Sequence, residues 1–530
     1  MPTRSSSYNL PVAATILAAP PLLSRDLRVS RKLKNGLICL GSFAIFSIIA
    51  GCVSTGGIAP HQGHLDPATL ATDSAIQAAN RDAGWPQERW WSVYGDPQLD
   101  AWIATALDNS PSLAEASARI RQAMALAGAA EAAEAPQVNA EVKLQRHKWP
   151  TDFFYGPGEL ADTTTWNNEA TLGLSYALDL WGRDRSDSER ARNVAYMAAA
   201  EARVAQLELE SNIVRTYVML SLQYAELDIG HSMLKQQQEM LELAQRRLRG
   251  GIGTDFEVSQ AQVPIPETRR KIDSLEEAIA LNRNRLSALA GKGPGAGASL
   301  RRPQLKLAAA AGLPSQVPAE LLGRRPDVVA SRWRVAALAK GVDVARAGFY
   351  PNVDLMASIG FNAVGGGMLE YLTKSKFNYS VGPAVTLPIF DGGRLRGELG
   401  ESAAAYDAAV AQYNQTLVNG LKDISDQLIR MHSADQQATF AAQSVQAAST
   451  AYQLAKEAYE GGLTDYLNVL QAQTSLFQQQ LTEQKVAATR LAVHADLLVA
   501  LGGGLIDQGD NPKPEALAPE TVRVKAPVDE

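Results

Sequence analysis

The stretch GGIGTDFEVSQAQ, residues 250–262, occurs a second time as GGLTDYLNVLQAQ, residues 461–473. The two copies align without a gap at an offset of 211 residues and share the pattern G-G-[I/L]-x-x-x-[F/L]-x-V-x-Q-A-Q. The glycine pair permits the positive φ of a chain reversal, and the Thr and Asp residues that follow are good helix caps: Thr254, Asp255, Thr464 and Asp465. One copy alone could be an ordinary helix hairpin, but two copies at a fixed offset predict an internal two-fold repeat.

Each copy joins two long helical patterns. The patterns that precede the glycines span Arg183–Arg249 and Arg394–Glu460, and neither contains proline. Apolar residues recur at steps of four and three, as in Ile213, Tyr217 and Leu220, which predicts helix-on-helix packing. At about 1.5 Å per residue, each helix is roughly 100 Å long. Helices that return from the two reversals are predicted at residues 255–290 and 464–501.

Four segments alternate apolar and polar residues: 137–146, 170–181, 352–362 and 378–390. In the first, Val138, Ala140, Val142 and Leu144 share one face, and Asn139, Glu141 and Lys143 share the other. A soluble hairpin with one buried face would show the same alternation. Strands of about 9–11 residues with this pattern are also typical of a transmembrane β-barrel that faces lipid outside and a wet lumen inside.

Four strands are too few to close a barrel, because about eight is the smallest number that packs side chains inside. An open sheet edge in lipid would leave backbone groups unsatisfied, at several kcal/mol each. Membrane strands would therefore require an oligomer, whose long helices continue the barrel as a tube. Aromatic residues make up only 6% of the chain, which suits long, closely packed helices better than one thick core. The predicted product is a conduit.

The N-terminus carries a predicted secretory signal over residues 1–51, although residues 1–24 indicate a start site placed too early. A basic region is followed by the apolar run Leu37–Ala50, which is shorter than the about 20 residues of a spanning helix. Ile49-Ala50-Gly51-Cys52 resembles the lipobox of bacterial lipoproteins, so we predict that Cys52 becomes the lipidated first residue.

The mature chain is predicted to hold a tether at 52–95, two structural repeats at 96–300 and 301–503, and a tail at 504–530. Pro264 and Pro266 fall inside the first return helix, where an interior proline costs about 3 kcal/mol. Either a local kink or a later helix start would accommodate them.

Cleavage before Cys52 removes six of the 50 basic residues and one of the 56 acidic residues, so the net charge changes from −6 to −11. This balance argues against nucleic acid as a partner. The only other cysteine, Cys39, leaves with the signal, so no disulfide can form within the mature chain.

Residues Pro318–Leu355 (PAELLGRRPDVVASRWRVAALAKGVDVARAGFYPNVDL) resemble the signature of the TolC-like outer-membrane factors. The lipobox, Leu178–Arg183 (LDLWGR) and Leu387–Arg394 (LPIFDGGR) narrow the resemblance to the NodT-type lipoproteins of efflux systems. It implies a mainly α protein that forms a homotrimer, with a trimeric α-barrel of long antiparallel helices and a 12-stranded transmembrane β-barrel. It also implies an outer-membrane location, a periplasmic adaptor protein and an inner-membrane RND pump as partners.

The resemblance leaves three functions open: the channel of an RND efflux system, the channel of a type I protein-secretion system, and a structural envelope lipoprotein without transport. The lipobox and the run Arg324-Arg325-Pro326-Asp327-Val328 favour a passive efflux conduit for small molecules. The substrate cannot be read from the sequence, because specificity in such systems lies largely in the pump.

The two reversal loops are the predicted adaptor-docking tips, since they lie farthest from the strands: Gly250, Gly251, Thr254, Gly461, Gly462 and Thr464. Leu467, Leu470 and Gln471 follow the second loop and are predicted to line the periplasmic constriction. The family usually carries an acid where Gln471 stands. An amide ring can exchange hydrogen bonds without charge, so we expect a gate with weak dependence on divalent cations.

No cofactor, metal or catalytic activity is predicted. Gly291-Lys292-Gly293 lacks the strand–loop–helix context of a phosphate-binding loop, and His61 and His64, in the tether, are the only closely spaced histidines. No nucleophile–base pair is suggested by the sequence. Arg324, Arg325 and Asp327 are predicted to anchor a turn and a helix start rather than to act chemically.

Overall fold

The computed structural model describes residues 54–71, 73–78, 85–151, 160–306, 324–365 and 367–504. These residues belong to a single compact unit that begins at Ser54. The predicted signal, Cys52 and the predicted tail beyond Gly504 lie outside the described residues.

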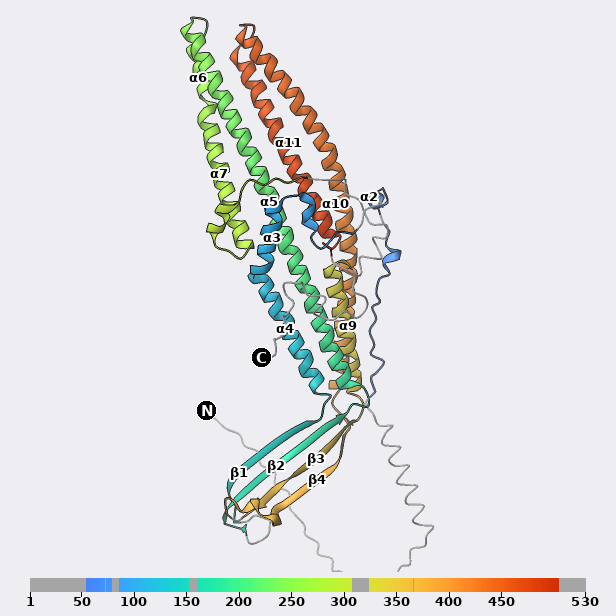
Figure 1. The fold of residues 1–530 in the computed structure, drawn as a ribbon. Helices are drawn as coiled ribbons and strands as arrows, with labels where there is room; N and C mark the ends of the chain where they lie inside the picture. The colour runs from blue at the N-terminus through green and yellow to red at the C-terminus, as the bar shows by residue number, and fades with distance from the viewer. Residues whose placement is uncertain are drawn as a thin grey trace, which may run out of the picture. The chain divides into compact units, whose positions relative to one another are not determined.

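Two helical hairpins carry the repeat (Figure 1). The first half contains α3 (Pro97–Asn109), α4 (Pro111–Ala132), α5 (Arg183–Arg249), α6 (Asp255–Gln262) and α7 (Pro264–Leu289), and the second contains α9 (Pro326–Ala347), α10 (Arg394–Glu460) and α11 (Tyr466–Ala500). The long helices α5 and α10 have 67 residues each and begin and end where the sequence predicts. The tips of both hairpins lie at the end of the molecule away from the strands. Within the described residues, no helix is both long enough and apolar enough to cross a bilayer.

Short helical elements lie outside these helices. They are η1 (Pro67–Thr69), α2 (Ser74–Ala78), η2 (Trp90–Tyr94), η4 (Pro294–Ser299), η5 (Glu370–Leu372) and η6 (Lys374–Lys376). The largest apolar cluster lies where η2 and α3 pack on the middle of α5. Trp90, Tyr94 and Ile103 are buried there against Ile213 and Tyr217. This cluster binds the chain's N-terminal part to the long helices.

The four strands form one antiparallel sheet in chain order: β1 (Gln137–Lys148), β2 (Thr164–Leu178), β3 (Asn352–Val364) and β4 (Phe377–Thr386). The register keeps each predicted face continuous across the sheet. Val138, Leu174, Ala357 and Val381 are successive partners on the apolar face, and Asn139, Gly173, Ser358 and Ser380 are successive partners on the polar face. Within the single chain the apolar face is uncovered, and Val381 is 77% exposed.

The strand ends differ from the prediction. The second strand was expected at 170–181 and the fourth at 378–390, but β2 spans 164–178 and β4 ends at Thr386. Pro388 has no N–H to donate, and the Asp391-Gly392-Gly393 turn follows it, so the alternation beyond Thr386 is not paired. The other two strands run two residues past their predicted ends.

The first return helix is broken, whereas the sequence predicted one helix over 255–290. Helix α6 ends at Gln262, and α7 begins at Pro264 after the single residue Val263. Val263 keeps a right-handed φ of −53°, so the break is a local kink. Pro264 and Pro266 thus lie in the first turn of α7, where backbone N–H groups have no helical partner and proline costs little. The second return helix, expected at 464–501, spans Tyr466–Ala500.

The predicted tether is bound along α10 instead of hanging free. We call residues 54–78 the strap, of which Thr72 lies outside the described residues. The Ser54 carbonyl accepts a 2.8 Å bond from Arg396 Nε, and the backbone N–H of His61 donates to Asp407 Oδ1 over 2.9 Å. Further along, Leu65 N donates to Asn414 and Asp73 bonds Ser425. Residue numbers rise together, so the strap runs parallel to α10, away from the sheet.

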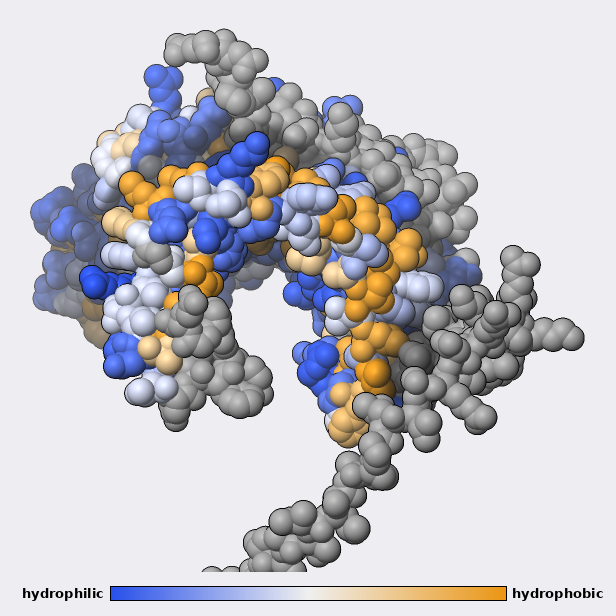
Figure 2. Space-filling model, turned by 90° about the horizontal axis from the view of Figure 1, so that it is seen from below, coloured by the Kyte–Doolittle hydropathy of each residue, from blue (hydrophilic) through white to orange (hydrophobic). Residues whose placement is uncertain are grey.

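Seen from below, the described part of the unit that begins at Ser54 curves around a hollow (Figure 2). Apolar and polar residues both occur along the visible surface of this arc. Strands β1 and β4 each have one partner within the chain, so each leaves one edge unpaired there. The fold therefore combines an open, curved arrangement with two sheet edges that a neighbouring chain can complete.

Candidate functional sites

Both hairpin tips use the same helix-ending turn. Ile252 N donates to Arg247 O over 3.1 Å, and Leu463 N donates to Ala458 O over 2.8 Å, which is the Schellman geometry. The second glycine of each pair has the positive φ, 74° at Gly251 and 72° at Gly462. The first glycine of each pair has a helical φ, so only one residue per pair requires glycine.

Each copy uses one of its two predicted caps, a threonine in the first copy and an aspartate in the second. Thr254 caps α6 in a complete capping box with Glu257. In the second copy the cap is Asp465, which accepts from Asn468 N, and not Thr464. Thr464 instead accepts a 2.7 Å bond from the Asn468 side chain through Oγ1. The gapless repeat alignment pairs Thr254 with Asp465, so it already contained this assignment.

The tips expose large apolar side chains. Ile252 and Leu463 occupy equivalent positions of the repeat, and Leu463 is 85% exposed. Phe256 and Leu467, another equivalent pair, are also exposed. Among the predicted constriction residues, Leu467 and Gln471 are exposed in the single chain, whereas Leu470 is partly buried between the hairpins.

Just behind the tips, a buried polar cluster joins the two hairpins. We call Arg247, Tyr452, Tyr459, Tyr466 and Gln473 the tip cluster. Arg247 donates from a terminal guanidinium nitrogen to Tyr459 O over 2.9 Å and lies 4.6 Å from the centroid of that ring. Burial raises the pKa of Tyr466 to about 12, so its hydroxyl is neutral. The sequence analysis missed this cluster, although its last four members recur at intervals of seven residues.

Polar atoms in this region lack partners. Among the described residues, Arg247 Nε, Tyr466 Oη and both amide atoms of Gln237 are buried without a hydrogen bond. Each such atom costs about 1–3 kcal/mol relative to solvation in water. These unpartnered atoms oppose the packing between the hairpins, which the apolar contacts of the same region favour.

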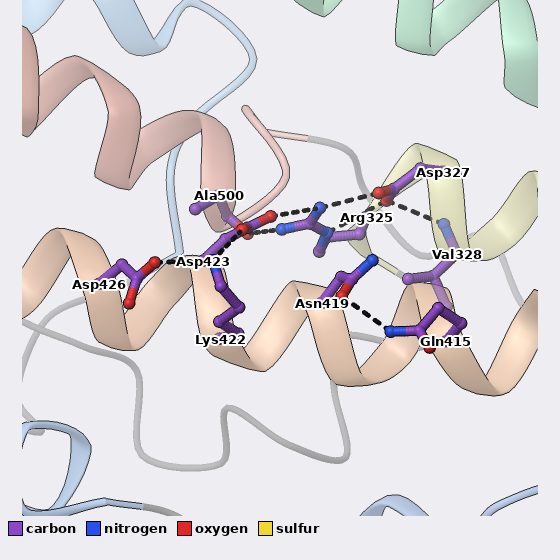
Figure 3. Close-up of polar contacts among 9 residues, drawn as sticks. All are labelled: Arg325, Asp327, Val328, Gln415, Asn419, Lys422, Asp423, Asp426 and Ala500. Atoms are coloured by element: carbon purple, nitrogen blue, oxygen red, sulfur yellow. Dashed lines mark hydrogen bonds and ion pairs between the residues drawn. The ribbon is translucent and has the colours of Figure 1, made fainter.

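Arg325 fastens three helices at the other end of α11 (Figure 3). One terminal nitrogen donates to Ala500 O over 3.0 Å, and the other donates to Asp327 Oδ2 over 2.8 Å and lies 3.6 Å from Asp423 Oδ2. Gly420 makes room on α10, since a Cβ there would lie 3.3 Å from Arg325 Nε. Burial alone would lower the pKa of Arg325, but Asp327 and Asp423 raise it. Arg325 begins α9 as predicted, and it also ties in α10 and α11, which the sequence did not indicate.

The remaining predicted residues are dispersed. Cys52 lies outside the described residues. His61 and His64 lie in the strap, where the His64 ring packs edge-on against Tyr413 at 5.2 Å. Within the described ranges, no three His, Cys, Asp or Glu side chains converge as metal ligands.

A family model described as "Outer membrane efflux protein" matches residues 102–292 and 317–503, which together span both repeats. The chain belongs to the outer membrane efflux protein family. The fusaric acid resistance protein FusA of Burkholderia cepacia is 51% identical to this efflux protein over 370 residues, 70% of each chain. The multidrug resistance outer membrane protein MdtP of Shigella flexneri is 32% identical over 497 residues, 90% of this chain and 98% of its own.

A solved structure extends the match to three dimensions. The outer membrane protein VceC of Vibrio cholerae superposes with a TM-score of 0.75 at 33% identity, covering 80% of this efflux protein and all of VceC. The predicted fold class is confirmed: the chain is mainly α, with long antiparallel helices and four strands that are one protomer's share of a trimeric, TolC-like channel. The predicted function as an outer-membrane efflux channel is also confirmed. Members of this family are channels rather than enzymes, and they reside in the outer membrane.

Proposed function

We propose that this efflux protein is the outer-membrane component of a tripartite system whose other members are a periplasmic adaptor and an inner-membrane RND pump. Its role is a passive conduit without catalysis or cofactor. The observation that carries the proposal is the placement of both hairpin tips at one end, opposite the sheet, with matching turns and exposed apolar side chains. An exposed apolar pair at the far end of a tube is suited to a protein partner rather than to water.

The homotrimer follows from the sheet. Three chains with four strands each supply the 12 strands that the resemblance implies, and closure pairs the free edge of β1 with the free edge of β4 of a neighbouring chain. The continuous apolar face, with Val381 and Tyr379 the most exposed of the large apolar residues on β4, would then face lipid.

Lipid on Cys52 would anchor the same end of the molecule. Ser54 is bonded to Arg396, the third residue of α10, so the strap begins at the junction of sheet and helices. Cys52 precedes Ser54 by two residues and can therefore reach the membrane surface. Mass spectrometry of the mature N-terminus tests this: a mature chain that begins at any residue other than a modified Cys52 would remove the anchor from the proposal.

The periplasmic gate is assigned to Leu467, Leu470 and Gln471 on α11, with the tip cluster holding each protomer's hairpins together. Because Gln471 carries an uncharged amide, divalent cations should block the resting channel only weakly. Gln471→Asp should introduce cation-sensitive block, measured as conductance in planar bilayers with and without added divalent cations. Equal block of both forms would place Gln471 outside the gate.

Docking is tested by cysteine crosslinking to the adaptor in cells. Leu463→Cys, at the second tip, should form an adduct with the adaptor, and Ile252→Cys should do so at the first. Leu126→Cys on α4 is the matched control, because Leu126 is also an exposed apolar residue but lies far from the tips. Adducts at Leu126 and none at the tips would contradict the docking assignment. Co-purification of an ABC transporter in place of an RND pump would favour a type I secretion system.

The transported class is proposed to be small organic molecules. The relative FusA is named for resistance to fusaric acid and MdtP for multidrug resistance. Growth of a deletion strain on graded concentrations of small organic acids and neutral drugs, with and without the gene restored, tests this class.

A further inference from the structure

A groove lies over α9 where the helices meet the sheet. It has a volume of about 470 Å³ and is bounded by the first turns of α5 and α10 on either side. Small residues of α9 and its C-cap line it, namely Gly341, Ala345 and Gly348, and Leu338 and Leu395 add apolar surface. The groove is therefore wide enough for a small molecule with an apolar body.

Three guanidinium groups surround this junction groove: Arg183 and Arg190 from α5 and Arg394 from α10. Arg190 is paired with Asp187 and Arg394 with Glu398, whereas the Arg183 side chain has no ion-pair partner among the described residues. Glu401 also lines the groove, so its lining is basic by one charge. Arg183 and Arg394 are equivalent residues of the repeat, each following the glycine that begins a long helix.

The face of α10 that lines the groove is opposite the face that binds the strap. Arg396, Asp407 and Asn414 contact the strap and are separated by 11 and 7 residues, which keeps them on one side of a helix with 3.6 residues per turn. Glu398, Ser402 and Ala405 line the groove at steps of four and three. Ala405 precedes Asp407 by two residues, about half a turn.

Because the groove and the strap lie on opposite faces of α10, the groove is assigned to the lumen. The strap comes from a membrane anchor, so it must run outside the tube; here the argument rests on the proposed function. A second hollow of about 450 Å³ continues on the same face, lined by Gln412, Thr416 and Asn419 and reaching Arg325. Molecules that move along this face toward the sheet pass Arg325 first and the junction groove last.

We propose that the junction groove is a transient binding site for small organic anions as they leave the helical tunnel and enter the barrel. A carboxylate would accept paired bonds from the planar guanidinium of Arg183, and the apolar body would lie against Leu338 and Leu395. In a trimer three such grooves surround one passage. The basic ring attracts the anion, and the neighbouring Glu398 and Glu401 keep binding weak enough for release.

Benzoate is the probe, and benzamide is its uncharged isostere. Purified wild-type trimers in planar bilayers should show a concentration-dependent fall in ion current with benzoate, at concentrations where benzamide has little effect. Arg183→Gln should raise the benzoate concentration for half-maximal block about tenfold, since one charge-assisted pair is lost. Arg185→Gln is the matched control, because Arg185 pairs with Glu189 and does not line the groove. It should leave the block unchanged.

Arg394→Gln provides a second variant if Arg183→Gln fails to assemble, and it should weaken benzoate block in the same direction. Equal block by benzoate and benzamide, or equal effects of Arg183→Gln and Arg185→Gln, would overturn the proposed anion site. The proposed channel function would still stand in that case, provided that the trimers conduct ions. If wild-type protein forms neither trimers nor conducting channels, the proposed function fails and the groove's role fails with it.

Discussion

The two repeats end their return helices with the same backbone contact but fasten it with different chemistry. Gly291 follows α7 and Gly502 follows α11 at the repeat offset of 211 residues, and both have positive φ. A Cβ on Gly291 would lie 2.2 Å from Asn109 O, and one on Gly502 would lie 2.1 Å from Arg324 O. We call these contacts the first and second joints. Each packs the end of a return helix against the residues just before α4 or α9.

The side chains at the two joints differ. At the first joint Ser110 bonds only Ser112 through its side chain, while at the equivalent position of the second joint Arg325 ties three helices together. The return helices also differ between the repeats. Helix α7 is separated from its tip by the kink at Pro264, whereas α11 is continuous over 35 residues. The second return helix is thus unbroken and is held at its base by a charged side chain, whereas the first is kinked and has a neutral side chain there.

The prediction with the largest expected effect tests whether Gly291 and Gly502 make equally close contacts with a backbone carbonyl. Gly502→Ala and Gly291→Ala should each destabilise the protein by about 3 kcal/mol or more, because the new Cβ meets a carbonyl at a positive φ. Urea unfolding followed by circular dichroism measures the loss. Gly251→Ala is the matched control, since it has a positive φ with no atom within 4 Å, and should cost only about 1 kcal/mol. Similar losses at all three positions would contradict the close contact.

The second prediction tests whether the joints differ in side-chain chemistry. Arg325→Met should cost about 2 kcal/mol, because Ala500 O and the partly buried Asp327 lose their donors. Ser110→Ala, the matched change at the first joint, should stay within about 0.5 kcal/mol. The same unfolding measurement applies. Comparable losses would show that the charge at the second joint adds nothing.

The third prediction concerns pH. Burial raises the pKa of Glu210 to about 7 from its ordinary 4.5, while Arg203, Gln206 and Trp90 oppose the rise. The native state therefore holds a proton that the unfolded state has released. The stabilising contribution of the proton is full below pH 4.5 and lost as pH rises through about 7. The equivalent position of the second repeat is Leu421, which does not titrate. This pH dependence of stability is therefore specific to the first repeat.

Glu210→Gln should flatten the pH dependence of stability between about 4.5 and 7 and make the protein more stable than wild type at pH 8. Melting temperature as a function of pH measures both effects. The added amide can also donate to Gln206 Oε1, which has no partner in the described structure. An unchanged pH profile would show that Glu210 is ionised in the native state.

The smallest effect is expected at the tips. Thr254→Ala should cost about 1 kcal/mol through loss of the capping box, whereas Thr464→Ala should be close to neutral because Asp465 is the cap there. Amide hydrogen exchange in the first turns of α6 and α11 resolves changes of this size. Faster exchange in Thr464→Ala than in Asp465→Ala would reverse the cap assignment.

The elements that could be located best from the sequence are those whose ends or faces are marked by residues in the element itself. The ends of α5 and α10 are marked by Gly182, Gly250, Gly393 and Gly461, and the faces of the strands are marked by strict alternation, so both were predictable. Strand ends were less so, because apolar residues such as Leu387 continue an alternating pattern beyond the last backbone pair. The position of the proline break was not predictable, because nothing local showed that the short helix α6 forms before Pro264.

Features that depend on distant partners were not predictable. The strap has the Gly- and Pro-rich composition of a linker, and its backbone is ordered by side chains of α10, namely Arg396, Asp407 and Asn414. The tip cluster and the Arg325 joint likewise join residues from separate helices. Regular spacing could have indicated the tyrosines, but no local pattern identifies which carbonyl Arg325 reaches.

The strap also sets an order of events during folding. His61 and its partner Asp407 are 346 residues apart, and the strap precedes both repeats in the chain, so it is synthesised before them. Its docking site on α10 does not exist until most of the protein has been made and that helix has formed. Contacts of such long sequence separation form slowly. The strap is therefore synthesised early but can bind only after α10 has formed. Its binding would thus follow the folding of the second repeat.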